Sequence, residues 1–120
     1  MRLRLVLGVV LLVATVTPAL AQITSATISG TIKDETGGVL PGVDVVVRNL
    51  ETGRARNVVT DENGYFTVPG LTPGRYETRA SLQGFTTAVQ NGIALEVAQQ
   101  AALNLVLRLG TTEETITVTG

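Results

Sequence analysis

The chain has 120 residues, of which 44% are hydrophobic and 16% are charged, a balance typical of a folded globular protein rather than a disordered one. Nine basic and ten acidic residues give a formal net charge of −1, and no basic cluster indicates a nucleic-acid-binding surface. Cysteine and histidine are both absent, which excludes disulfides and any nucleophile activated by histidine.

The first 21 residues have the pattern of a secretory signal peptide. Arg2 and Arg4 form a positive start, Leu5–Val16 is apolar, and Ala19-Leu20-Ala21 is a small-x-small cleavage site before Gln22. The apolar run is shorter than the roughly 20 residues that a membrane-spanning helix needs. We therefore predict export, with a mature chain that carries seven basic and ten acidic residues, a formal charge of −3.

The mature chain contains short runs in which apolar and polar residues alternate, as they do along half-buried strands. Seven such runs are expected at residues 27–33, 43–49, 54–60, 65–68, 75–82, 93–97 and 103–109. Turn signals recur every 8–12 residues or so, which favours an all-β, seven-stranded antiparallel β-sandwich over residues 22–110. A closed barrel of similar strand number is the competing arrangement.

Turn chemistry is densest between residues 60 and 76. Asn63-Gly64 favours a tight hairpin that joins the strand at 54–60 to the strand at 65–68, and Pro73-Gly74 favours a type II turn. The expected core contains the inward-facing residues of these strands, namely Ile28, Ile32, Val43, Val45, Val47, Phe66, Val68, Tyr76, Phe85, Leu103, Leu105, Leu107 and Leu109.

No combination of residues indicates catalysis, so we expect neither an enzyme nor a metal or cofactor site. Asp61, Glu62 and Asn63 could hold calcium only with further oxygen ligands at fixed spacing, and these are missing. The adjacent Glu113 and Glu114 point to opposite faces of an extended chain, which does not suit an acid–base pair. For sugar binding, Tyr65 is the one aromatic residue that is not expected in the core.

The order of these turn motifs resembles a known family. The motifs are Ser29-Gly30, Gly37–Val43, Asn49–Gly53, Thr60–Phe66, Leu71–Tyr76 and Gly84-Phe85. Over residues 26–109 they resemble the carboxypeptidase regulatory-like domain. The resemblance implies a transthyretin-like, Ig-like sandwich of the kind also grouped with carbohydrate-binding folds, and it implies no function by itself.

The last ten residues, 111–120, are expected to form an extended tail that leaves the domain. Within it, Glu114, Thr115, Ile116, Thr117, Val118, Thr119 and Gly120 resemble a TonB box. In TonB-dependent outer-membrane receptors this segment adds as a β-strand to the energy transducer TonB, and alternating β-branched residues suit strand addition. The alternative is an eighth edge strand or a frayed terminus.

Together, signal, sandwich and box imply a non-catalytic periplasmic interaction or spacer module of a Gram-negative bacterium, at the N-terminal end of a TonB-dependent receptor. A receptor barrel does not fit into 120 residues. We therefore expect either the front part of a receptor or, as the alternative, a stand-alone secreted domain that binds glycans or a surface protein.

Overall fold

The structure is a computed structural model that describes residues 24–111 and 114–119. The predicted signal peptide, residues 1–21, lies outside the described residues. Within the described ranges, no helix is long and apolar enough to cross a membrane.

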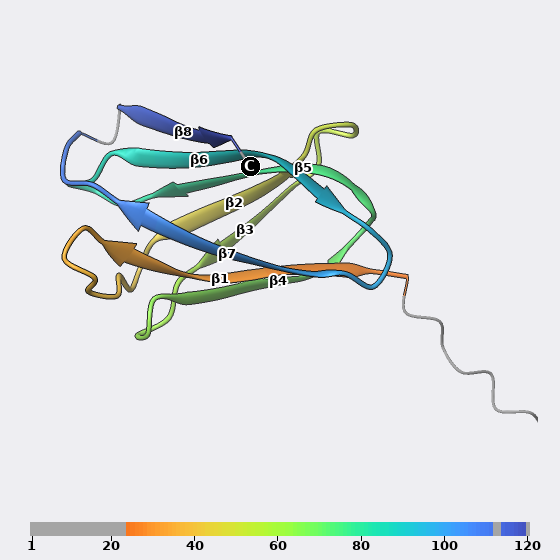
Figure 1. The fold of residues 1–120 in the computed structure, drawn as a ribbon, viewed down its shortest axis with the longest axis horizontal. Helices are drawn as coiled ribbons and strands as arrows, with labels where there is room; N and C mark the ends of the chain where they lie inside the picture. Colours follow the sequence, from red (N-terminus) through yellow and green to blue (C-terminus); the bar gives the residue numbers. More distant parts are fainter. Residues whose placement is uncertain (1–23, 112–113, 120) are drawn as a thin grey trace, which may run out of the picture.

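The described residues form eight strands (Figure 1). Their bounds are β1 Ala26–Asp34, β2 Asp44–Asn49, β3 Ala55–Val59, β4 Tyr65–Leu71, β5 Gly74–Ser81, β6 Thr87–Leu95, β7 Gln100–Leu107 and β8 Thr115–Thr119. Each of the seven predicted strands overlaps a strand of the structure, but the one predicted at 93–97 covers only the end of β6. Buried and exposed residues alternate as the sequence indicates in β1, β2, β5 and β7, whereas β3 is almost wholly exposed and β6 begins with three buried residues in a row. The eighth strand is formed by the C-terminal tail.

The strands form two sheets that face each other, so the predicted β-sandwich is confirmed. The smaller sheet has the order β4-β1-β7 and the larger one β3-β2-β5-β6-β8. Most neighbouring strands are antiparallel, but β1 and β7 are parallel, as are β6 and β8. Two adjacent strands can be parallel only when a crossover connects them, so the purely antiparallel arrangement expected from the short turns is not complete.

The core between the sheets is apolar and closely follows the predicted set. Two of the residues that were predicted to be in the core are not fully buried: Phe85 is only partly buried, and Leu109 is 80% exposed. The prediction for Leu109 is wrong because β7 ends at Leu107, after which the chain crosses from the smaller sheet to the larger one. The alternation that buries Leu103, Leu105 and Leu107 therefore does not continue.

The Asn63-Gly64 turn reverses the chain but does not form the predicted hairpin. β3 lies at the edge of the larger sheet and β4 at the edge of the smaller sheet, so the turn carries the chain from one layer to the other. Gly64 has a φ of +70°, and a Cβ on it would lie 2.6 Å from the carbonyl oxygen of Ile32. Glycine is required here for its backbone conformation and for the close approach of β1.

Candidate interaction site

The segment that resembles a TonB box forms the last strand of the larger sheet. β8 pairs in parallel with β6, from Thr87 opposite Thr115 to Asn91 opposite Thr119. Just before the strand, the amide of Thr87 donates a hydrogen bond to the carbonyl of Glu114, at 2.8 Å. The prediction that the tail leaves the domain is therefore wrong for its described part. The alternative of an eighth edge strand describes its position.

The path of the chain after β7 explains why the tail reaches β6. The amide of Thr86 donates to the carbonyl of Arg108 at 2.7 Å, and the amide of Gly110 donates to the carbonyl of Gly84 at 3.1 Å. A Cβ at Gly110 would overlap the hydroxyl of Thr86, so a larger residue there would require the Thr86 side chain to move. These bonds direct the chain onto the larger sheet, and β8 then continues along β6 (Figure 1).

The two apolar side chains of β8 face a groove rather than the closed core. Ile116 is 38% exposed and Val118 is 47% exposed, and both line a groove with a volume of about 520 Å³. Their partners on β6, Ala88 and Gln90, line the same groove, whose other side is formed by residues 104–106 of β7. β8 is hydrogen-bonded to β6 alone, so it is held by fewer neighbours than the central strands.

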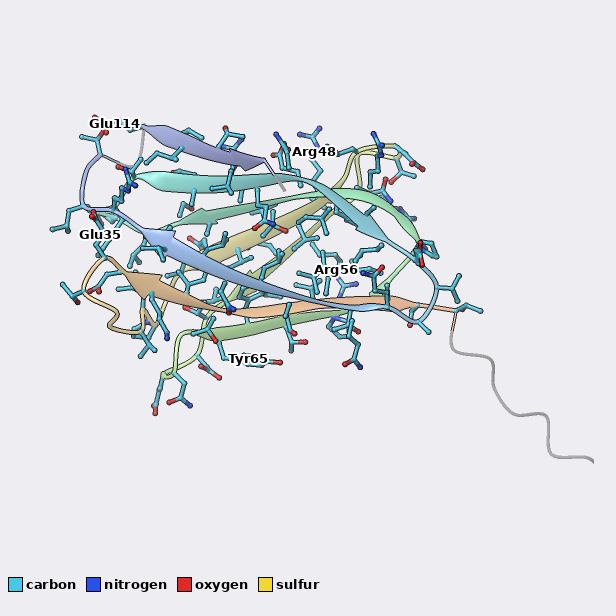
Figure 2. The ribbon with its side chains drawn as sticks, in the orientation of Figure 1. Glu35, Arg48, Arg56, Tyr65 and Glu114 are labelled. Atoms are coloured by element: carbon cyan, nitrogen blue, oxygen red, sulfur yellow. The ribbon has the colours of Figure 1, made fainter. Side chains whose placement is uncertain are left out.

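The structure thus brings together Glu114, Thr115, Ile116, Thr117, Val118 and Thr119 on one edge strand, while Gly120 lies outside the described residues. Glu114 is exposed at the start of that strand (Figure 2). The sequence indicated an extended conformation for this segment. It held no signal for the pairing with β6, because that pairing depends on the crossing at residues 108–110.

The acidic turn at residues 61–64 uses an Asp61 carboxylate oxygen within the chain. One carboxylate oxygen of Asp61 accepts hydrogen bonds from the amides of Asn63, at 2.9 Å, and Tyr65, at 3.0 Å. This is an Asx turn, in which the side chain stabilises the reversal. Among residues 24–111 and 114–119, no group of three or more acidic, histidine or cysteine side chains could hold a metal ion.

The aromatic residues are distributed much as the sequence predicted. Phe66 and Tyr76 are buried, and the Tyr76 hydroxyl donates a 2.6 Å hydrogen bond to the carbonyl of Thr72. Tyr65 is 43% exposed and projects from β4 away from the sandwich (Figure 2). It is the one exposed aromatic side chain within the described ranges.

These features define a β-sandwich module with an open edge strand. The family is set by the sequence: residues 27–108, more than half of the chain, match the carboxypeptidase regulatory-like domain. The chain belongs to this family. No curated protein matches it in sequence.

Solved structures share the sandwich at low identity. One is a type II cohesin–X-dockerin complex from Acetivibrio cellulolyticus, with 22% identity and a TM-score of 0.57 over 71% of this chain and 58% of that one. Another is a putative carbohydrate-binding protein from Bacteroides uniformis, with 17% identity and a TM-score of 0.56 over 68% of this chain and 40% of that one. Hydroxyquinol 1,2-dioxygenase from Pseudomonas putida has 10% identity and a TM-score of 0.59, over 77% of this chain and 59% of that one.

The chain therefore spans less than two thirds of each of these three structures. Because the set includes both a binding complex and an enzyme, the shared fold alone assigns no activity to this chain.

Proposed function

We propose that this chain is a non-catalytic periplasmic module at the N-terminal end of a TonB-dependent outer-membrane receptor. In this proposal the sandwich is a folded spacer, and Glu114–Gly120 binds the energy transducer TonB by β-strand addition. One observation carries the proposal: the segment that resembles a TonB box adopts a strand at an open sheet edge.

The composition of this edge supports strand addition. β8 is the last strand of its sheet, so the backbone groups on its outer side have no strand partner among the described residues. Thr115–Thr119 contains no charged residue and no proline, the features that usually protect an exposed edge from pairing. An incoming strand would gain main-chain hydrogen bonds along this edge.

The role as a spacer is supported by the closed core of the sandwich. The buried hydrophobic cluster is formed by residues between Ala26 and Leu107, without any contribution from β8. The domain can therefore keep its fold while its tail exchanges partners. The non-catalytic assignment is supported by the family and by the lack of histidine and cysteine in the sequence.

The test is a binding titration of the mature chain, Gln22–Gly120, against the periplasmic C-terminal domain of TonB from the same organism. A second chain ends at Gly110. Two further variants, Ile116→Pro and Thr117→Pro, each remove one amide donor from β8. Because the amides of successive residues point to opposite edges of the strand, one of the two variants removes a donor from the outer edge.

We expect saturable binding that is lost without the tail and weakened by at least one of the two prolines. Glu62→Pro is the matched control, because Glu62 is exposed at the second position of the Asp61–Gly64 turn, where proline is favoured. Equal binding by the full and the shortened chain, or no binding at all, would contradict the proposal.

The second candidate function is a secreted domain that binds glycans or a surface protein. The exposed ring of Tyr65 favours it, since an exposed aromatic face can stack on a sugar. Glycan binding that is lost in Tyr65→Ala, together with no binding to TonB, would support this alternative.

A further inference from the structure

A second hollow lies on the other side of the sandwich, where the edge strands β3 and β4 face each other. Its volume is about 330 Å³, within the range of small-molecule sites. Val47, Leu71 and Tyr76 contribute its apolar walls, and Asn49, Arg54 and Arg56 contribute its nitrogen donors. We call this hollow the arginine cleft.

Both arginines line the cleft, and Arg56 lies on the inner face of the larger sheet. Arg56 is opposite Val47 in the pairing of β2 with β3, and the side chain of Val47 is completely buried. Arg54 lies just before β3 and lines the same cleft. Figure 2 shows Arg56 between the two layers, whereas Arg48 lies on the outer side of the sheet. Both side chains are exposed, so the cleft holds two positive charges at its solvent-facing rim, above the buried Val47.

These charges have few partners within the described part of the chain. Nη1 of Arg56 donates a 3.3 Å hydrogen bond to the carbonyl of Pro69, and the side chain of Arg54 makes no hydrogen bond there. The ion pair present in the described ranges joins Arg79 to Glu77, outside the cleft. No carboxylate lines the cleft. Most guanidinium donors are therefore available to a ligand.

Asn49 adds a third donor to the arginines. It is 4% exposed and lines the cleft. Its Oδ1 accepts hydrogen bonds from the amides of Glu51, at 2.8 Å, and Thr52, at 3.0 Å, which fixes the orientation of the side-chain amide. Nδ2 has no hydrogen-bond partner among residues 24–111 and 114–119. Nδ2 is not among the enclosed side-chain atoms that lack a partner, so it is open to solvent and available to donate to a ligand acceptor.

We propose that the arginine cleft binds a small organic anion, a carboxylate or a phosphate, through Arg54, Arg56 and Asn49. The planar guanidinium fork matches both kinds of oxyanion, and hydrogen bonds between charged groups are stronger than those between neutral ones. The inference is independent of the proposed TonB contact, because the cleft lies at the β3 edge of the larger sheet and β8 lies at the opposite edge.

A simpler role for inward-pointing arginines on an edge strand is to prevent pairing with other chains. That role requires only the charges of Arg54 and Arg56. It needs neither a ligand, nor a cleft of small-molecule size, nor an available Asn49 amide. The two roles therefore differ in whether an anion binds at all.

The experiment is calorimetric titration of Gln22–Gly120 at physiological salt with four probes: D-galacturonate, citrate, glucose 6-phosphate and inorganic phosphate. D-galactose is the neutral control. The first two probes test carboxylates and the last two test phosphates, so the pattern identifies which oxyanion the cleft takes. Physiological salt screens weak attraction to exposed charges.

We expect at least one anion to bind saturably, and we expect Arg54→Gln and Arg56→Gln each to weaken that binding about tenfold or more. Arg48→Gln is the matched control: it removes the same charge from the same sheet, but from the outer face, and it should bind as the unmodified chain does. Thermal unfolding of each variant confirms that the sandwich is intact.

Three results would overturn the proposal. One is that none of the four anions binds at about 1 mM, a concentration that detects even weak sites. Another is that the glutamine variants in the cleft bind as well as the unmodified chain. The third is that Arg48→Gln loses as much affinity as they do, which would show general attraction to a basic surface.

Discussion

At the scale of single residues, two buried threonines have opposite relations to their surroundings. The hydroxyl of Thr60 accepts a hydrogen bond from the amide of Val43 at 2.9 Å and donates one to the carbonyl of Leu40 at 2.7 Å. Thr78 is completely buried in β5, and its hydroxyl has no partner in the described part of the chain. Burial of a polar group costs free energy unless a hydrogen bond replaces its contact with water.

We therefore expect Thr78→Val to raise the free energy of unfolding by about 1 kcal/mol, because valine keeps the shape and removes the unsatisfied hydroxyl. Thr60→Val should lower it by about 1–3 kcal/mol, since two backbone groups lose their partner. Urea unfolding of both variants checks the pair. A loss of stability in Thr78→Val equal to that in Thr60→Val would show that Thr78 is hydrogen-bonded in solution.

Asp34, at the end of β1, provides a pH dependence. The hydrogen bond from the Thr36 hydroxyl, together with those from the amides of Gly38, Thr36 and Gly37, lowers the pKa of its carboxyl below the ordinary value of 3.8. The folded state thus prefers the carboxylate, so this contribution to stability is present above pH 3.8 and is lost as the pH falls through the lowered pKa.

We expect the advantage of the unmodified chain over Asp34→Asn to shrink as the pH falls from about 6 to about 2. Asparagine keeps an acceptor oxygen but does not titrate. Urea unfolding across this range measures the difference. An advantage that stays constant with pH would mean that the carboxylate has no special preference for the folded state.

Leu105 and Val106 test the alternation in β7 directly. Leu105 is 4% exposed and Val106 is 56% exposed, although they are neighbours in one strand. We expect Leu105→Ala to lower the free energy of unfolding by about 2–5 kcal/mol. Val106→Ala, at a surface position, should change it by no more than about 0.5 kcal/mol. Unfolding in urea provides both values. Similar losses in the two variants would contradict the assignment of faces.

At the scale of elements, the parallel pairing of β1 with β7 depends on one glycine. Gly30 is opposite Leu103, and a Cβ on it would overlap the Leu103 carbonyl. We expect Gly30→Ala to destabilise the domain by about 1–3 kcal/mol, the usual cost of forcing extra atoms into a packed interior. Thermal or urea unfolding measures this loss. Unchanged stability would show that β7 can move away from β1 without cost.

The sequence predicted the positions of most strands, because most have a local period of two. It missed the start of β6, where Thr87, Ala88 and Val89 are buried in succession. It did not predict which strands pair. Asn63-Gly64 has the chemistry of a hairpin turn, yet the strands on either side of it belong to different sheets. Turn residues determine where the chain reverses, whereas the choice of sheet depends on contacts between residues far apart in the sequence.

The same limit applies to the candidate sites. The alternation in Thr115–Thr119 predicted a strand, but its pairing with β6 follows from the crossing near Gly110. Arg54 and Arg56 look like solvated residues of an edge strand in the sequence. The structure leaves both side chains exposed, but it places Arg56 opposite the buried Val47, which becomes visible only through the register of β2 with β3. Non-local register is the information that the sequence pattern lacks.

At the scale of the whole molecule, the sandwich separates two surfaces. β3 and the arginine cleft lie at one edge of the larger sheet, and β8 lies at the other, with β2, β5 and β6 between them. The core that joins the layers contains no residue of β8. Such an arrangement suits a module that stays folded while its C-terminal strand binds a partner.

Nuclear magnetic resonance can test the proposal that this C-terminal strand is the contact with TonB. The backbone amide signals of Gln22–Gly120 would be followed during titration with the periplasmic domain of TonB. We predict that the largest changes occur in Thr115–Thr119 and in their partners Thr87–Asn91 of β6. Changes confined to another surface, such as the surroundings of Tyr65, or no changes at all, would contradict it.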